Sequence, residues 1–118
     1  MNQSTIELAS AARTTTQTGA DLANKDHRGI HVIVEVTNAG TGSITPKIQG
    51  KGANGTYYDL LVGTAITANG VTVLKLGPGI AAAANAAAPD FLPRVFRIVI
   101  THNNGNTITY SVSREMMD

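Results

Sequence analysis

Apolar and polar residues alternate along several short segments of the chain, and this alternation is typical of half-buried β-strands. β-Branched and aromatic residues are frequent in the same segments. The predicted strands are residues 30–37, 44–49, 56–62, 71–76, 94–102 and 107–113. The side chains predicted to face a common core are Ile30, Val32, Val34, Val36, Ile44, Ile48, Phe96, Ile98, Ile100, Ile108, Tyr110 and Val112.

Turn-forming residues separate these segments. TANG (67–70) carries the Asn-Gly signal of a tight hairpin, with ITA before it and 71–76 after it as the arms. NNGN (103–106) is interpreted as a second hairpin turn, and NAGTGS (38–43) as turn chemistry.

The stretch GKGANG (50–55) lies between two predicted strands, with Lys47 before its first glycine and Lys51 directly after it. A phosphate-binding loop needs G-x-x-x-x-G-K-[ST] between a strand and a helix. Here the spacing differs and a strand follows, so the stretch is predicted to be a hairpin loop. Pro46 lacks an amide donor, which predicts that the strand before the loop lies at a sheet edge or carries a β-bulge.

An alanine-rich stretch, 80–88, interrupts the strand pattern. Alanine has the highest helix propensity, and Pro78 and Pro89 bracket the stretch. A turn or two of helix is therefore predicted, packed on the end of the fold as a crossover between two sheets. A contact between this stretch and a neighbouring subunit is the alternative.

Residues 1–27 are rich in Thr, Ala and Ser and hold few large apolar side chains. They are expected to form an edge strand or an arm that orders against a neighbour, and a loosely held terminus is the alternative. The chain is thus predicted to have an N-terminal arm (1–27) and a β-sandwich domain (28–118).

Together these elements predict an all-β fold. We expect a small antiparallel β-sandwich of six to seven strands, immunoglobulin-like or jelly-roll-like, with the short Ala-rich helical crossover and the extended N-terminal arm.

The composition narrows the class of function. The 118 residues have 14% charged residues and a net charge of +1, with no basic run that would favour nucleic-acid binding. They contain no cysteine, no signal-peptide pattern and no apolar run near the ~20 residues of a membrane helix. We expect a chain made in the cytoplasm, with no nucleic-acid or membrane partner, whose low surface charge suits an assembled state.

No set of residues supports metal binding or catalysis. His27 and His31 are four residues apart, but Gly29 and a predicted strand intervene, so the rings need not converge. Glu35 and Asp59 resemble a glycosidase pair only by residue type. We therefore expect no enzyme activity, no cofactor, no metal site and no small-molecule substrate.

Two further pairs are candidate binding groups. Tyr57 and Tyr58 are adjacent, and one of two such neighbours normally faces the core, which leaves little for sugar stacking. Arg94 and Arg97 are three apart and should point to opposite faces of a strand, so they do not form one anion clamp.

The order of several motifs resembles a family of short tailed-bacteriophage proteins. The matching stretches are ITPKIQGKGANGTYYDLL, TAITANGVTVLKLGPG, the alanine run, FLPRVFRIVITH and ITYSVS, which together span about 44–113. Phe96 stands where tryptophan is common in that family, and residues 1–27 have no counterpart.

The resemblance implies a virion structural protein, in particular a head decoration (cement) protein on the outer capsid. Its implied partners are the major capsid protein and other copies of itself, and its mechanism would be to stabilise contacts between capsid subunits. A tail, neck or baseplate component, or a carbohydrate-binding host-adsorption module, are the alternatives. The predicted contact segment of the arm is Thr14, Thr15, Thr16, Gln17 and Thr18.

Overall fold

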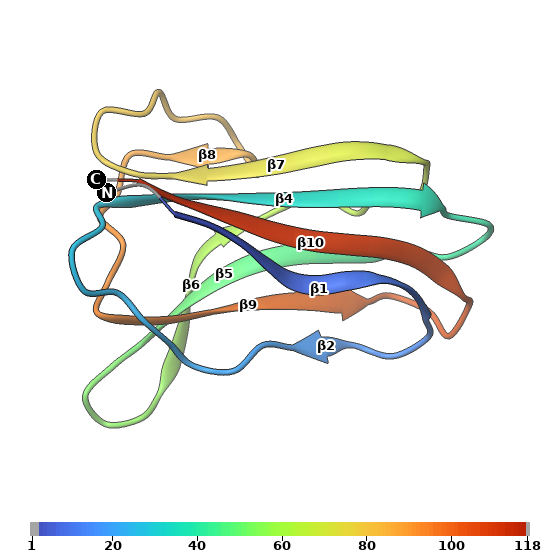
Figure 1. The fold of residues 1–118 in the computed structure, drawn as a ribbon, viewed down its shortest axis with the longest axis horizontal. Helices are drawn as coiled ribbons and strands as arrows, with labels where there is room; N and C mark the ends of the chain where they lie inside the picture. Colours follow the sequence, from blue (N-terminus) through green and yellow to red (C-terminus); the bar gives the residue numbers. More distant parts are fainter. Residues whose placement is uncertain (1–2, 118) are drawn as a thin grey trace.

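The computed structural model describes residues 3–117, which form ten β-strands in two stacked sheets (Figure 1). The first sheet has the order β1-β10-β4-β7-β8 and the second has β2-β9-β5-β6, with β3 also paired to β9. All pairs are antiparallel except β7 and β8. The strands are β1 (Gln3–Arg13), β2 (Gln17–Thr18), β3 (Leu22–Ala23), β4 (Gly29–Asn38), β5 (Ile44–Lys51), β6 (Tyr57–Val62), β7 (Gly70–Leu76), β8 (Ala87–Ala88), β9 (Val95–His102) and β10 (Ile108–Met117).

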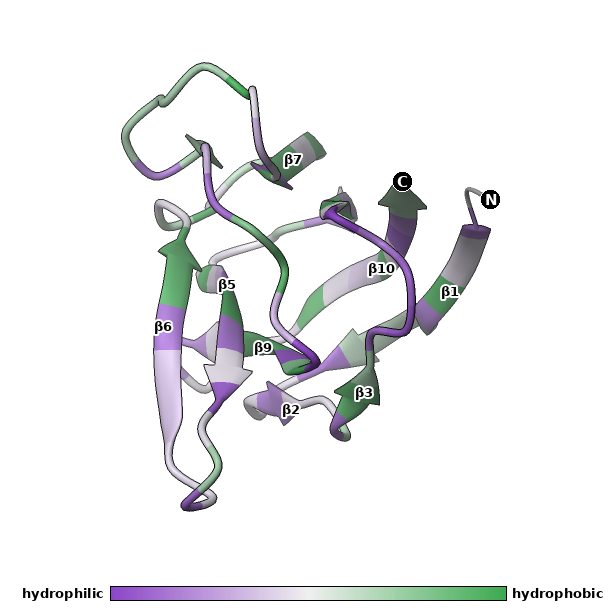
Figure 2. Ribbon diagram, turned by 90° about the vertical axis from the view of Figure 1, so that its left-hand side faces the viewer, coloured by the Kyte–Doolittle hydropathy of each residue, from purple (hydrophilic) through white to green (hydrophobic). Residues whose placement is uncertain are grey.

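The predicted core is confirmed. Every side chain predicted to face inward is buried, and Tyr110 and Phe96 are the largest of those that are completely enclosed. Figure 2 shows green segments along β9 and β10, the strands that carry six of these side chains. Burial of each such side chain contributes about 1.5–3 kcal/mol, so this shared apolar layer is what holds the sheets together.

The GKGANG stretch is a hairpin loop, as predicted. It joins β5 to β6, which pair antiparallel from Lys47 opposite Val62 to Lys51 opposite Tyr57. Gly55 has a φ of 85°, a conformation that favours glycine. β5 is an inner strand rather than an edge, and its register with β9 is regular through Pro46. The register shift against β6, where Ile48 faces Leu61 and Gln49 faces Asp59, leaves the extra residue on β6, so the edge or bulge predicted from Pro46 is wrong.

The prediction of a hairpin at 103–106 is wrong. This turn joins β9 of the second sheet to β10 of the first, because each of these strands has other partners on both sides. The turn at 38–43 also passes between the sheets, and the two lie side by side. The Asn103 amide donates to the Ser43 carbonyl at 2.9 Å, and the Asn104 side chain donates to the Thr41 carbonyl at 3.2 Å.

The hairpin predicted at 67–70 is also wrong, because the chain here passes from β6 in the second sheet to β7 in the first. Ile66 makes only an isolated bridge to Ile44. Asn69 accepts a hydrogen bond from the Ala39 amide at 2.8 Å, which holds the passing chain against the turn after β4.

The prediction of a helical crossover at the alanine-rich stretch is wrong. Residues 80–88 form no helix and lead from β7 to β8 of the same sheet, and the chain passes to β9 of the second sheet only after them. The stretch turns at Asn85, which has a φ of 59°, and then runs parallel to β7 as β8. A helix this short is marginal. Backbone bonds with β7 replace it, from Lys75 to the Ala86 carbonyl and from Gly77 to the Ala88 carbonyl.

The N-terminal residues 3–23 are paired in both sheets. β1 lies along β10, from Gln3 opposite Met116 to Arg13 opposite Ile108, so this part is the edge strand that the sequence allowed. β2 and β3 lie along β9. Residues 1 and 2 of the predicted arm lie outside the described residues, and the boundary at residue 27 stays a prediction. Residues 3–117 contain no helix long and apolar enough to span a membrane.

Candidate functional site

The predicted contact residues Thr14, Thr15, Thr16, Gln17 and Thr18 form the bend where the chain passes from the first sheet to the second. Gln17 is half-buried, and the four threonines are exposed. The bend lies at the same end of the sandwich as the turns at 38–43 and 103–106, on the right in Figure 1. The structure thus gathers these residues into one continuous surface, and their contact with a partner stays a prediction.

One group of side chains fixes the start of this bend, and we call Arg13, Thr16, His102 and Tyr110 the Tyr110 anchor. Arg13 donates to the Tyr110 carbonyl at 2.6 Å, and its guanidinium lies 4.8 Å from the centre of the Tyr110 ring. The Tyr110 hydroxyl and His102 Nε2 share a hydrogen bond of 2.8 Å. The His102 amide donates to Thr16 Oγ1 at 3.0 Å, which ties the bend to β9.

Burial sets the protonation states in the Tyr110 anchor. It lowers the pKa of His102 below its usual value, and the nearby positive charge of Arg13 lowers it further. Burial raises the pKa of Tyr110 to about 12. The imidazole is therefore neutral near pH 7. His102 Nδ1 is buried and has no hydrogen-bond partner among the described residues, so it cannot easily accept a proton.

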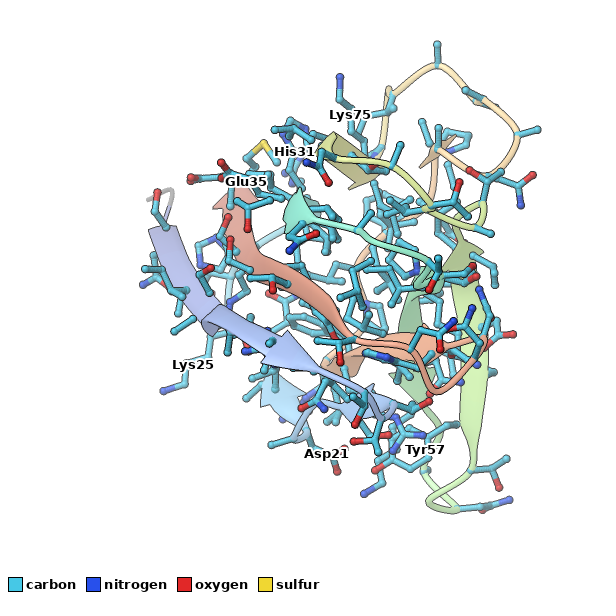
Figure 3. The ribbon with its side chains drawn as sticks, turned by 90° about the vertical axis from the view of Figure 1, so that its right-hand side faces the viewer. Asp21, Lys25, His31, Glu35, Tyr57 and Lys75 are labelled. Atoms are coloured by element: carbon cyan, nitrogen blue, oxygen red, sulfur yellow. The ribbon has the colours of Figure 1, made fainter. Side chains whose placement is uncertain are left out.

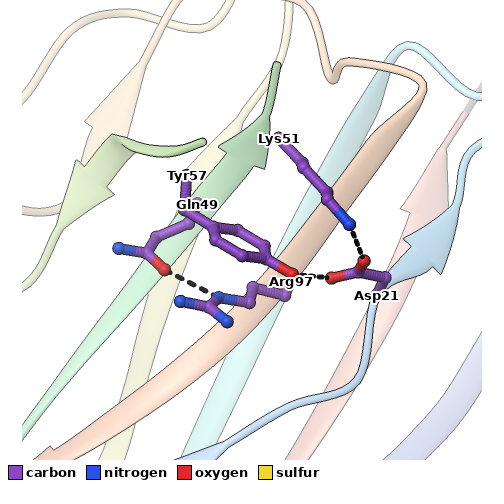
Figure 4. A network of polar contacts seen from close by, with 5 residues as sticks. All are labelled: Asp21, Gln49, Lys51, Tyr57 and Arg97. Carbon is purple, nitrogen blue, oxygen red and sulfur yellow. Dashed lines mark hydrogen bonds and ion pairs between the residues drawn. The ribbon is translucent and has the colours of Figure 1, made fainter. Parts of the chain in front are cut away.

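A second group fixes the chain between β2 and β3, and we call Asp21, Lys51, Tyr57 and Arg97 the Asp21 anchor (Figure 4). Asp21 accepts hydrogen bonds from Lys51 at 2.7 Å and from the Tyr57 hydroxyl at 2.6 Å. The Arg97 guanidinium lies 3.4 Å from the centre of the Tyr57 ring. The β5–β6 hairpin thus holds the N-terminal segment from the outer side of the second sheet.

Hydrogen bonds extend the Asp21 anchor along the sheet. Arg97 donates to Gln49 at 2.8 Å, and Gln49 donates to Asp59 at 2.8 Å. Gln49 is 8% exposed, the only buried polar side chain in the described part of the chain. Asp59 also pairs with Lys47 at 3.6 Å. Both lysines around the hairpin loop therefore already have carboxylate partners.

The hydrogen bonds from Lys51 and Tyr57 lower the pKa of Asp21 below its usual value. The same bond to Asp21 raises the pKa of Lys51. Both groups are solvent-exposed, so screening weakens their attraction and the ion pair orients the chain more than it stabilises it.

A shallow hollow of about 600 Å³ lies beside the Asp21 anchor. Asp21 and Lys51 line one side, already bonded to each other, and exposed Arg94 lines another. Arg94 and Arg97 are therefore in different surroundings, as the sequence suggested. Apolar Leu22 and Val95 also line the hollow, and no set of convergent acid, base and nucleophile is present among its lining residues.

The other candidate pairs form no site of the predicted kind. Glu35 lies on β4 of the first sheet, with His31, whereas Asp59 lies on β6 of the second, so they cannot flank one sugar bond (Figure 3). Neither tyrosine of the adjacent pair is buried: Tyr57 stacks on Arg97, and Tyr58 lies over Gly50. Within residues 3–117, no three His, Cys, Asp or Glu side chains are placed to hold a metal ion.

Several residues of these anchors were not singled out from the sequence. Arg13 and Asp21 lie in a segment with no apolar pattern, and Gln49 is an uncharged residue in a predicted strand. The only sequence signal for Arg13 and Asp21 is a single charged residue next to small residues. Such a signal does not identify a contacting residue that is distant in the sequence.

Comparison with known proteins gives the fold. No protein-family model matches the chain, and no curated protein matches it. The crystal structure of the SPBc2 prophage-derived protein YomS is similar over 98% of this chain and 92% of that one, with 11% identity and a TM-score of 0.58. The crystal structure of PirA is similar over 97% and 95%, with 15% identity and a TM-score of 0.55.

A third similar structure is that of the infectious bursal disease virus Gx strain. It has 11% identity and a TM-score of 0.49, and 33% of its chain is covered by 99% of this one, which is too weak to carry an argument. At these identities the first two likenesses establish the all-β architecture over nearly the whole chain and leave the function open.

Proposed function

We propose that the chain is a structural protein of a bacteriophage virion, and that it acts as a decoration (cement) protein on the outer capsid. It would bind the major capsid protein and stabilise contacts between capsid subunits. The observation that carries the proposal is the exposed bend Thr14–Thr18, which the two anchors hold on a rigid sandwich. A bend held in this way binds with less loss of conformational entropy than a free arm.

Two other observations support this role. The sequence motifs of 44–113 resemble those of tailed-phage proteins, and the fold is similar over most of its length to a prophage-derived protein. The polar side chains of the second sheet are bonded to one another in the Asp21 anchor, as in a rigid building block. We propose accordingly that the protein is not an enzyme and that it is located on the surface of the virion.

The experiment is cryo-electron microscopy of the phage that encodes this chain, with mass spectrometry to detect the protein in purified particles. We expect density on the outer capsid between capsomers, with the bend 14–18 facing the major capsid protein. Density at the tail, neck or baseplate would overturn the capsid assignment, and absence from the particle would overturn the virion role.

A binding assay with particles that lack the protein tests the bend itself. We expect the combined variant Thr14→Ala, Thr15→Ala and Thr18→Ala to bind more weakly than the unchanged protein. The matched control replaces exposed Thr64 and Thr67, which lie between β6 and β7. Equal binding by the two variants would exclude the bend as the contact. Binding to a glycan array would instead favour the host-adsorption alternative.

A further inference from the structure

The edges of the two sheets differ in how well they are closed. β8, at one edge of the first sheet, has two residues. The edge formed by β2 and β3 is interrupted between the two strands, where the backbone of Gly19 packs against the Ile98 carbonyl. At the edge strand β6, the Asn85 side chain donates to the Val62 carbonyl at 2.9 Å. Among the described strands, β1 is the longest edge strand, with eleven residues. Edge strand β6 has six residues, and β7 is uncovered by β8 from Gly70 to Leu74.

The open part of β1 is its first half. Gln3 to Ile6 pair in regular register with β10, whereas register shifts follow between Ile6 and Leu8 and between Leu8 and Ala11. Arg13 donates to the carbonyls of Ala9 and Ala11, so the second half is irregular and partly capped. Figure 2 shows the first half at the outer side of its sheet, with no other strand beyond it.

The side chains of this half leave the edge accessible. Gln3 and Glu7 line hollows between the two sheets, so they point inward, and Ser4 and Ile6 point outward. Ile6 is 71% exposed, the highest value among the large apolar side chains of the described residues. Lysine and proline, the residues that commonly block an edge strand, are absent from 3–13.

We propose that this edge binds a second copy of the same chain. Residues 3–7 of the two copies would pair antiparallel about a two-fold axis at Thr5, which joins the two first sheets into one. The chemistry fits a self-pairing edge: Glu7 faces Gln3 of the other copy and Ile6 faces Ser4, so no like charges lie opposite.

The two-fold arrangement also explains why a second copy suits this edge. Each β1 covers the other, so the pair closes and leaves no open edge for further growth. The low charge of the chain adds little repulsion between copies. Because the ladder is short, the dimer is weak: it forms at high protein concentration and dissociates on dilution. The proposal does not rest on the virion role, since purified protein alone tests it.

The chain contains no cysteine, so a single introduced cysteine reports pairing directly. Thr5→Cys would place two thiols opposite each other across the axis, where the Cα separation of an antiparallel pair permits a disulfide. The matched control is Val71→Cys, which lies on β7 in the same sheet and is 63% exposed. Under mild oxidation, we expect Thr5→Cys to cross-link roughly tenfold faster than the control. Equal rates would overturn the proposal.

A dilution series of the unchanged protein in analytical ultracentrifugation gives an independent result. We expect a monomer–dimer equilibrium that Ile6→Lys weakens by several-fold and Val71→Lys leaves unchanged, since lysines at position 6 lie diagonally across the axis. Both positions are exposed, so both variants should fold. A monomer at every concentration, or equal effects of the two lysines, would overturn the proposal.

Discussion

The two anchors hold the same N-terminal segment by opposite physical means. The Tyr110 anchor is built on a side chain that is completely buried, and the Tyr110 hydroxyl and carbonyl bond to the partly buried side chains of His102 and Arg13. The Asp21 anchor joins Asp21 and Lys51 at the solvent-exposed surface. Hydrogen bonds cost most to lose where they are buried, so the first anchor should control stability and the second only local order.

The largest expected difference comes from removing the tyrosine of each anchor. Tyr110→Ala should lower the free energy of unfolding by about 3–5 kcal/mol, because it leaves a cavity in the core. Tyr57→Ala should cost less than about 2 kcal/mol, because Tyr57 is only half-buried. Urea unfolding of both variants measures this, and equal losses would show that the anchors do not differ.

The cations of the two anchors should differ in the same direction. Arg13→Gln removes the bond to the Tyr110 carbonyl and should cost about 1–2 kcal/mol, since Arg13 is half-buried. Lys51→Gln should leave the midpoint of urea unfolding unchanged, because the ion pair with Asp21 is exposed. A larger shift for Lys51→Gln than for Arg13→Gln would contradict the comparison.

The anchors should also respond to acid at different pH. The pKa of His102 is lower in the folded chain than the usual 6.5, so the unfolded chain binds more protons just below that value. Stability should therefore fall as the pH drops below about 6.5. The pKa of Asp21 is lowered from 3.8, so its contribution is lost only as the pH falls below that value.

Thermal melts between pH 8 and 2 measure both parts of this dependence. Burial also lowers the pKa of His31, so that histidine contributes in the same direction. His102→Gln and His31→Gln separate the two contributions. If His102→Gln leaves the slope of stability against pH unchanged, the Tyr110 anchor does not respond to protonation.

The smallest expected effect is that of Asp21→Asn. It removes the charge that Lys51 pairs with, and it should leave global unfolding unchanged while loosening the chain near β2 and β3. Hydrogen exchange at the amides of Gly19 and Asn24, which bond to Ile98 and Arg94, should become faster. High salt should produce part of the same change in the unchanged protein, and unaltered exchange would show that the anchor does not order the segment.

Between residues 30 and 113, the sequence predicted the long strands and the side chains that face the core, because alternation along a strand is a local property. It did not predict which strands pair. The turns at 38–43 and 103–106 have similar composition to hairpin turns, yet both pass between the sheets. Turn residues determine that the chain reverses, and long-range pairing determines which sheet it enters.

The same limit explains the other differences. The alanine stretch has high helix propensity, but bonds to β7 and the turn at Asn85 outweigh it. The N-terminal segment has few large apolar side chains, so its pairing with β10 and β9 depends on backbone hydrogen bonds and on the anchors, which the sequence does not display. The bend 14–18 could be named from composition, but the side chains that hold it could not.

The pairing of β1 with β10 has a consequence for how the chain is made. Gln3 lies opposite Met116, so two residues that are 113 positions apart in the sequence pair directly. Until β10 is synthesised, β1 has no partner for its backbone groups, and non-local pairing of this kind folds slowly. The first sheet is therefore completed only after β10 has been synthesised, and the emerging chain must keep β1 from pairing with other strands until then.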